Sequence, residues 1–149
     1  MATFPLPPDF LEFLRLLNSH RVEYLLIGGY AVGLHGYPRA TADLDVWVAI
    51  DPRNAAQITE AIREFGFATP DLAPQLFLEP DKVVRMGVPP LRIDILTTIA
   101  GVEFRECYSS RKTVVVDGTE IPFIGREDLI KNKRATGRAQ DLADLDHLP

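Results

Sequence analysis

Apolar and polar positions along the chain follow the two periods that distinguish helices from strands. Apolar residues recur at helical spacing over 10–17, and Asp9 is placed to cap the start of this helix. A second amphipathic helix is predicted over 52–65, with Asp51 as its cap and Gly66 as its stop. The N-terminal half of the chain should therefore contribute two long helices, each with one apolar face.

Runs rich in β-branched and aromatic residues predict the strands. The first two, 22–27 and 43–50, are separated by a turn at Gly28 and Gly29 and a short helix over 30–35. Two later pairs of runs flank turn-forming residues and are expected to form antiparallel hairpins, at 82–87 with 91–99 and at 112–116 with 119–124.

The order of these elements predicts the fold class. Strand and helix alternate at first and hairpins follow, which favours an α+β fold with a mixed β-sheet and flanking helices over a doubly wound parallel sheet. Helices at 126–136 and 138–147, separated at Gly137, are expected to close the chain as a pair. Residues 67–81 show no clear pattern. Because the chain has no repeat or linker, residues 1–149 are expected to form a single domain.

Charge and composition exclude several classes of protein. The formal net charge of −5 at pH 7 argues against general nucleic-acid binding, which depends on Lys and Arg, but allows a locally held small anion. No apolar stretch approaches the roughly 20 residues that span a bilayer, and the start of the chain lacks a secretory signal. We therefore expect a cytoplasmic protein that does not bind membranes. Cys107, the only cysteine, excludes an internal disulfide and is expected to be a small buried or half-buried side chain.

Asp43 and Asp45 are the clearest candidates for chemistry. Side chains two residues apart in a strand point to the same face, so their Cα atoms should lie about 6.5 to 7 Å apart. Two such anions raise each other's pKa unless a cation lies between them, and hard oxygen ligands favour Mg²⁺ or Mn²⁺. Asp94, in "LRIDIL", supplies a third strand carboxylate. Three carboxylates can hold two metal ions, the arrangement that serves nucleotidyl transfer.

Gly28 and Gly29 lie directly before the short helix. Because they lack Cβ atoms, the backbone can approach a ligand closely, and free N–H groups at a helix start favour phosphate. Either feature alone is more often a plain turn or an exposed strand edge. In combination they predict a site where the glycines hold a triphosphate and metal ions bridge it to the aspartates.

The combination "LIGGYAVGLHGYPRATADLDVWV" (25–47) with "LRIDIL" (91–96) resembles the DNA polymerase β-like nucleotidyltransferase superfamily. The pattern of that superfamily is an apolar strand, Gly-Gly or Gly-Ser, a short helix, Asp-x-Asp on the next strand and a third aspartate on a later one. The chain is most similar to the minimal nucleotidyltransferases of bacteria and archaea. Its tail, "EDLIKNKRATGRAQDLADLDHL" (127–148), looks like their closing helix pair. The resemblance implies the nucleotidyltransferase fold over most of the chain, with 67–81 unaccounted for.

The resemblance also implies roles for individual residues. Asp43, Asp45 and Asp94 would be the catalytic residues and metal ligands, with Asp94 as the candidate base for the acceptor hydroxyl. Gly28 and Gly29 would hold the triphosphate. Further nucleotide contacts are expected from residues ahead of the aspartate pair and in the tail: Arg39, Thr41, Lys133 and Arg138.

The two basic residues of the tail have an alternative interpretation. Lys133 and Arg138 could lie on a solvated helix face, paired with Asp141 and Asp144 through contacts three or four residues apart. If they contact phosphate instead, their replacement by Ala should weaken nucleotide affinity and leave the melting temperature nearly unchanged.

The sequence therefore predicts a Mg²⁺- or Mn²⁺-dependent enzyme that transfers a nucleotidyl group from a nucleoside triphosphate, with ATP the first candidate, to a hydroxyl acceptor. The resemblance admits protein, RNA and small-molecule acceptors, some of them within toxin–antitoxin pairs. A helical partner protein or a second copy of the chain could complete the acceptor site. The competing hypothesis is a non-catalytic module of the same fold that binds nucleotide, metal or a partner protein.

Overall fold

The computed structural model of the protein describes residues 6–88 and 91–149. Within these ranges it contains six strands, which are β1 (Tyr24–Ile27), β2 (Asp43–Val48), β3 (Val83–Val88), β4 (Leu91–Leu96), β5 (Lys112–Val116) and β6 (Thr119–Phe123). The same ranges contain the helices α1 (Pro8–Ser19), α2 (Gly28–Leu34), α3 (Pro52–Phe65), α4 (Phe104–Ser109), α5 (Arg126–Thr136) and α6 (Ala139–His147), with a 3₁₀ helix at Pro74–Phe77.

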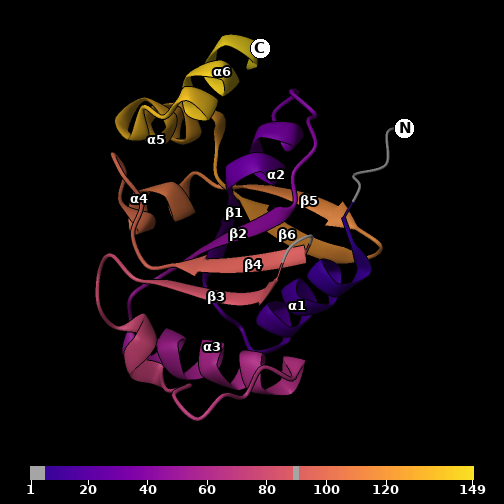
Figure 1. Ribbon diagram of the computed structural model, residues 1–149, viewed down its shortest axis with the longest axis vertical. Helices are drawn as coiled ribbons and strands as arrows, with labels where there is room; N and C mark the ends of the chain where they lie inside the picture. Colours follow the sequence, from indigo (N-terminus) through magenta and orange to yellow (C-terminus); the bar gives the residue numbers. More distant parts are fainter. Residues whose placement is uncertain (1–5, 89–90) are drawn as a thin grey trace.

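The described strands form one mixed sheet in the order β3-β4-β2-β1-β6-β5. β2 lies between β4, to which it is parallel, and β1, to which it is antiparallel. The two predicted hairpins, β3 with β4 and β5 with β6, are present as antiparallel pairs. The expected α+β fold with a mixed sheet and a C-terminal helix pair is therefore confirmed, and Figure 1 shows α5 and α6 side by side at one end of the molecule.

Two apolar cores lie on the two faces of the sheet. One core combines α1 and α3 with Leu44, Val46 and Val48 of β2. The other combines α2, α4 and α5 with Trp47, whose indole Nε1 donates a hydrogen bond to the Thr97 carbonyl. Because side chains alternate along a strand, Asp43 and Asp45 share the face of Trp47. The catalytic candidates therefore lie on the face that α2, α4 and α5 cover.

Local signals in the sequence placed most helix ends correctly. The Asp51 carboxylate accepts a hydrogen bond from the Asn54 N–H at 3.0 Å, and Gly66 ends α3 with φ 103°. The predicted cap at Asp9 is wrong, since α1 begins at Pro8 and Asp9 already lies in its first turn. There its charge complements the positive end of the helix without capping it.

Several segments differ from the sequence-based expectation. The glycine pair begins α2 instead of forming a separate turn, and α4 was not predicted, since six residues are too few to show a helical period. Residues 67–81, for which the sequence predicts no element, contribute the fully buried Phe77 to the core with α3. The turn predicted after Val88 falls on residues 89 and 90, which lie outside the described residues.

Two further expectations concern burial. Cys107 is a small buried side chain, as predicted, and burial raises the pKa of its thiol to about 12. Each helix in residues 6–88 and 91–149 is too short or too polar to cross a lipid bilayer.

Candidate active site

Parallel pairing of β2 with β4 brings the three predicted aspartates together. Asp45 lies directly opposite Asp94 in the register, and Asp43 lies opposite Arg92. Asp94 is buried, whereas the carboxylates of Asp43 and Asp45 are partly exposed. The strands thus present three carboxylates on one face of the sheet at neighbouring positions.

Two site residues were not predicted from the sequence: Arg85, whose Nε lies 3.5 Å from Asp94 Oδ1, and Arg92, which makes the closer contacts. Arg92 Nη2 donates to Asp43 Oδ2 at 2.8 Å and to Asp94 Oδ2 at 3.4 Å, and its Nε lies 3.2 Å from Asp94 Oδ1. The two-residue spacing between Arg92 and Asp94 places both on one strand face, and this signal could have revealed it. The guanidinium therefore neutralises part of the charge that the aspartates concentrate here.

Asp45 carries the uncompensated charge of this cluster. Burial, followed by the neighbouring carboxylates of Asp94 and Asp43, raises its pKa to about 6. The positive charges of Lys133 and Arg92 act in the opposite direction but do not outweigh them. Within the described part of the chain Asp45 has no ion pair. A further cation near Asp45 would therefore lower the free energy of the folded protein.

The donor set fits a hard divalent cation by its chemistry, since all three side chains offer carboxylate oxygens and the Asp45 charge is uncompensated. The arrangement as it stands does not form a complete metal site. Among residues 6–88 and 91–149, no group of three acidic, histidine or cysteine side chains is arranged to hold a metal ion. Arg92 contacts two of the three carboxylates.

The glycine pair lies directly against the aspartates. Gly28 has φ 71°, in the left-handed region, and a Cβ there would overlap Asp45 Oδ2. A Cβ on Gly29 would lie 2.6 Å from Thr41 Oγ1 and 3.3 Å from Arg39 Nη1. Both positions therefore require glycine, and the predicted nucleotide residues Gly28, Gly29, Arg39 and Thr41 are neighbours of Asp45.

We expect Gly29→Ala to lower the free energy of unfolding by about 1 to 3 kcal/mol, because the added Cβ overpacks against Thr41. Gly33→Ala is the matched control in the same helix. Outside its own helix turn, a Cβ on Gly33 would meet Pro38 Cα at 3.9 Å, an ordinary contact distance, so this variant should gain up to about 1 kcal/mol from helix propensity. Urea unfolding measures both changes, and equal losses would contradict a close approach specific to Gly29.

The tail of the chain does not offer Lys133 as a free phosphate ligand. The Lys133 side chain is only 5% exposed, and its Nζ lies 3.0 Å from both Asp141 Oδ1 and Asp144 Oδ2. The solvated-face interpretation is wrong for Lys133: its partners are the expected Asp141 and Asp144, but the contacts are buried and join α5 to α6 instead of residues three or four positions apart. Arg138 is 74% exposed on the side chain and pairs with Asp141 at 2.7 Å, which agrees with that interpretation.

These pairs change the charge balance of the tail. Burial raises the pKa of Asp141, but hydrogen bonds from Arg138 and Lys133 outweigh it and hold the pKa well below its usual range. The tail nonetheless lies near the aspartates, since Lys133 acts electrostatically on Asp45 and Asp45 raises the pKa of Arg138. The structure thus brings the predicted tail residues to the site, with their charges largely satisfied by α6.

The described fold is shared with solved structures. It resembles a candidate nucleotidyltransferase from Thermotoga maritima with a TM-score of 0.65 and 17% identity, over 95% of this chain and 93% of that one. It also resembles an antigenic nucleotidyltransferase-like protein from Paracoccidioides brasiliensis with a TM-score of 0.55 and 18% identity, over 95% of this chain and 75% of the other. No family model and no curated protein matches the sequence.

These similarities extend over nearly the whole chain, including the sheet that carries the three aspartates. At this level of identity they establish architecture and leave activity to be argued from the site. The chain therefore has the nucleotidyltransferase fold.

Proposed function

We propose that this protein is a Mg²⁺- or Mn²⁺-dependent nucleotidyltransferase that transfers a nucleoside monophosphate from a nucleoside triphosphate, ATP in the first instance, to a hydroxyl acceptor. The observation that carries the proposal is the packing of Gly28 and Gly29 against Asp45, with Asp94 directly opposite on β4. A backbone able to approach phosphate thus lies beside carboxylates that lack a full complement of cations.

In this proposal Asp43, Asp45 and Asp94 hold the metal ion. The bound ion would polarise the α-phosphate and favour ionisation of the acceptor hydroxyl, in an in-line displacement that releases pyrophosphate. Asp94 is the candidate base, because it is buried on β4 directly opposite Asp45. Gly28 and Gly29 would give the triphosphate close access to the backbone.

In this proposal Arg92 competes with the metal ion for the carboxylates. Its contacts to Asp43 and Asp94 offset part of the negative charge of these two carboxylates in the ligand-free protein. A divalent cation on the same oxygens would compete with the guanidinium, and Arg92 would then be available to the substrate. We therefore expect metal binding to be weak alone and stronger in the presence of nucleotide.

The same Arg92 contacts favour a second function, a non-catalytic binding module. An arginine that permanently satisfies the aspartates would leave the fold able to bind nucleotide or a partner protein without turnover. This alternative predicts nucleotide-induced stabilisation that does not depend on metal and no transfer of label.

The test is incubation of the protein with each α-³²P-labelled nucleoside triphosphate, Mg²⁺ or Mn²⁺ and a cell lysate, followed by separation of proteins, RNA and small molecules. We expect label to appear in one acceptor class with the parent protein and to be absent with Asp94→Asn. Asp71→Asn, an exposed aspartate outside the site, is the matched control and should transfer label normally.

Two results would contradict the proposal. Metal-independent stabilisation by nucleotide, with no transfer from any triphosphate, would replace the enzyme with the binding module. Equal transfer by the parent and by Asp94→Asn would remove the three aspartates from the mechanism.

A further inference from the structure

We propose that Asp144 is a positioning residue that holds the Arg39 guanidinium against Gly29, where Arg39 binds the triphosphate of the nucleotide. The inference rests on the proposed nucleotide site. It adds that a residue near the end of the chain holds one of the side chains of that site in position. It gives Asp144, one of two buried aspartates of α6, a role in substrate affinity that neither the motif nor the fold supplies.

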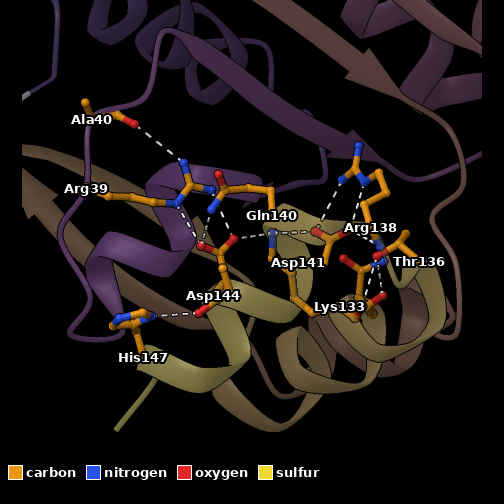
Figure 2. Close-up of polar contacts among 11 residues, drawn as sticks. Arg39, Ala40, Lys133, Thr136, Arg138, Gln140, Asp141, Asp144 and His147 are labelled. Atoms are coloured by element: carbon orange, nitrogen blue, oxygen red, sulfur yellow. Dashed lines mark hydrogen bonds and ion pairs between the residues drawn. The ribbon is translucent and has the colours of Figure 1, made fainter.

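Asp144 is fully buried and has four donors on one carboxylate. Arg39 Nε donates to Oδ1 at 2.9 Å and Arg39 Nη2 to Oδ2 at 3.0 Å, so the arginine is held by two parallel bonds. Lys133 Nζ lies 3.0 Å from Oδ2, and Gln140 Nε2 donates to Oδ1 at 3.0 Å. Figure 2 shows these side chains converging on Asp144 between α6 and the segment that carries Arg39. Paired, planar contacts of this kind fix the orientation of a guanidinium.

The two bonds to Asp144 determine which edge of Arg39 remains available. They use Nε and Nη2 and leave Nη1, which lies 3.3 Å from the Cβ position of Gly29. The hydrogen bond that Nη1 makes within the described residues is a long one, 3.5 Å to the Ala40 carbonyl. An anion bound at Gly29 could therefore accept a hydrogen bond from Arg39 Nη1, with which only the long bond to Ala40 would compete among the described residues.

Arg39 depends on Asp144 because its own segment is irregular. Residues 37–42 lie in neither helix nor strand, so no regular backbone hydrogen bonding holds the arginine in place. The partner comes from α6, 105 positions away in the sequence. Loss of the Asp144 charge should therefore release Arg39 to solvent even where the rest of the fold persists.

The neighbouring Asp141 provides a control within the same network. It contacts Lys133 and Arg138, and it accepts a hydrogen bond from the Arg138 backbone N–H at 3.3 Å. No contact joins it to Arg39 among the residues that the structure describes. Replacement of Asp141 disturbs the same buried ion cluster as replacement of Asp144 but leaves the two bonds to Arg39 in place.

The test compares Asp144→Asn with Asp141→Asn, both isosteric and both losing one buried charge. Affinities for α,β-methylene-ATP and for AMP are measured in Mn²⁺ by titration calorimetry, at a temperature where circular dichroism shows each variant folded. We expect Asp144→Asn to bind α,β-methylene-ATP about tenfold more weakly with less than a twofold change for AMP, because Arg39 faces the outer phosphates. Asp141→Asn should change both affinities less than twofold.

Arg39 variants complete the test. Arg39→Ala should lose as much affinity for α,β-methylene-ATP as Asp144→Asn, and the double variant should lose no more than either. Arg39→Lys, which keeps the charge but cannot make both bonds to Asp144, should also lose affinity and replaces Asp144→Asn if that variant fails to fold.

Unchanged affinity in Asp144→Asn or in Arg39→Lys would overturn the positioning role, as would equal losses in Asp144→Asn and Asp141→Asn. Failure of the proposed function is a separate result. In that case the parent protein itself would not bind α,β-methylene-ATP with Mn²⁺, and the positioning role would fall with it.

Discussion

Asp45→Asn is expected to stabilise the ligand-free protein at pH 8 by about 2 kcal/mol while it abolishes the stabilisation that metal and nucleotide give the parent. Burial and the neighbouring Asp94 and Asp43 raise the pKa of Asp45 to about 6, roughly 2 pKa units above its ordinary value. Each unit corresponds to about 1.4 kcal/mol of preference for the neutral form, and solvent screening of this partly exposed side chain reduces the total to about 2 kcal/mol. Asn keeps the shape of the side chain and removes the charge that causes the penalty.

The pH dependence has a definite sign. A carboxyl group whose pKa is raised on folding binds its proton more tightly in the folded state, so its contribution to stability falls as pH rises from about 4 to about 6. The advantage of Asp45→Asn should therefore be full at pH 8 and nearly absent at pH 4. The charged groups that set this behaviour are Asp94, Asp43, Lys133 and Arg92.

Thermal unfolding at several pH values measures this effect, and about 2 kcal/mol corresponds to roughly 4 to 8 °C for a chain of this length. With ligand at 100 times its dissociation constant, Mg²⁺ and ATP should stabilise the parent by about 2.7 kcal/mol and leave Asp45→Asn unchanged. Asp71→Asn serves as the control for loss of one negative charge. A destabilised Asp45→Asn at pH 8 would contradict repulsion among the three carboxylates, and a full ligand response in that variant would contradict the proposed metal site.

Lys133→Met should destabilise the protein by about 3 to 5 kcal/mol. The substitution removes the buried cation that lies 3.0 Å from both Asp141 and Asp144. Each carboxylate then keeps one arginine among the described residues, and the loss of a buried ionic partner costs far more than a surface pair is worth. The structure therefore reverses the expectation that removal of Lys133 leaves the melting temperature nearly unchanged. At roughly 2 to 4 °C for each kcal/mol, a fall of about 10 °C is expected.

Arg138→Ala is the matched control for this prediction. Its guanidinium bonds to the same Asp141, but the side chain is 74% exposed, so solvent screens the pair and the loss should be about 1 kcal/mol or less. Differential scanning calorimetry of both variants measures the difference. Similar melting temperatures for Lys133→Met and the parent would place Lys133 in solvent and restore its assignment as a free phosphate ligand.

Much of this protein could be predicted because the signals are local. The cap of α3 joins Asp51 to Asn54, three residues away, and the shared face of Asp43 and Asp45 follows from the two-residue period of a strand. The β5–β6 hairpin likewise depends on Asp117 and Gly118, which both adopt positive φ. Backbone geometry over a few residues determines each of these features, so the sequence alone contains the information.

The composition of the site was decided only by tertiary structure. Arg92 contacts Asp43 because β4 pairs in parallel with β2, a choice made by packing of the whole sheet. Lys133 is buried because α6 folds back over α5. A helix period cannot reveal this, since α5 is polar over most of its surface and the partners of Lys133 lie beyond its end.

For Arg39, too, the sequence shows one part of the role and the tertiary structure the other. The sequence by itself determined that an arginine precedes the aspartate pair and that the tail ends in a basic and acidic helix pair. The bond from Arg39 to Asp144 joins residues 105 positions apart. Its strength depends on desolvation of the carboxylate, which exists only once α6 has packed against the loop before β2.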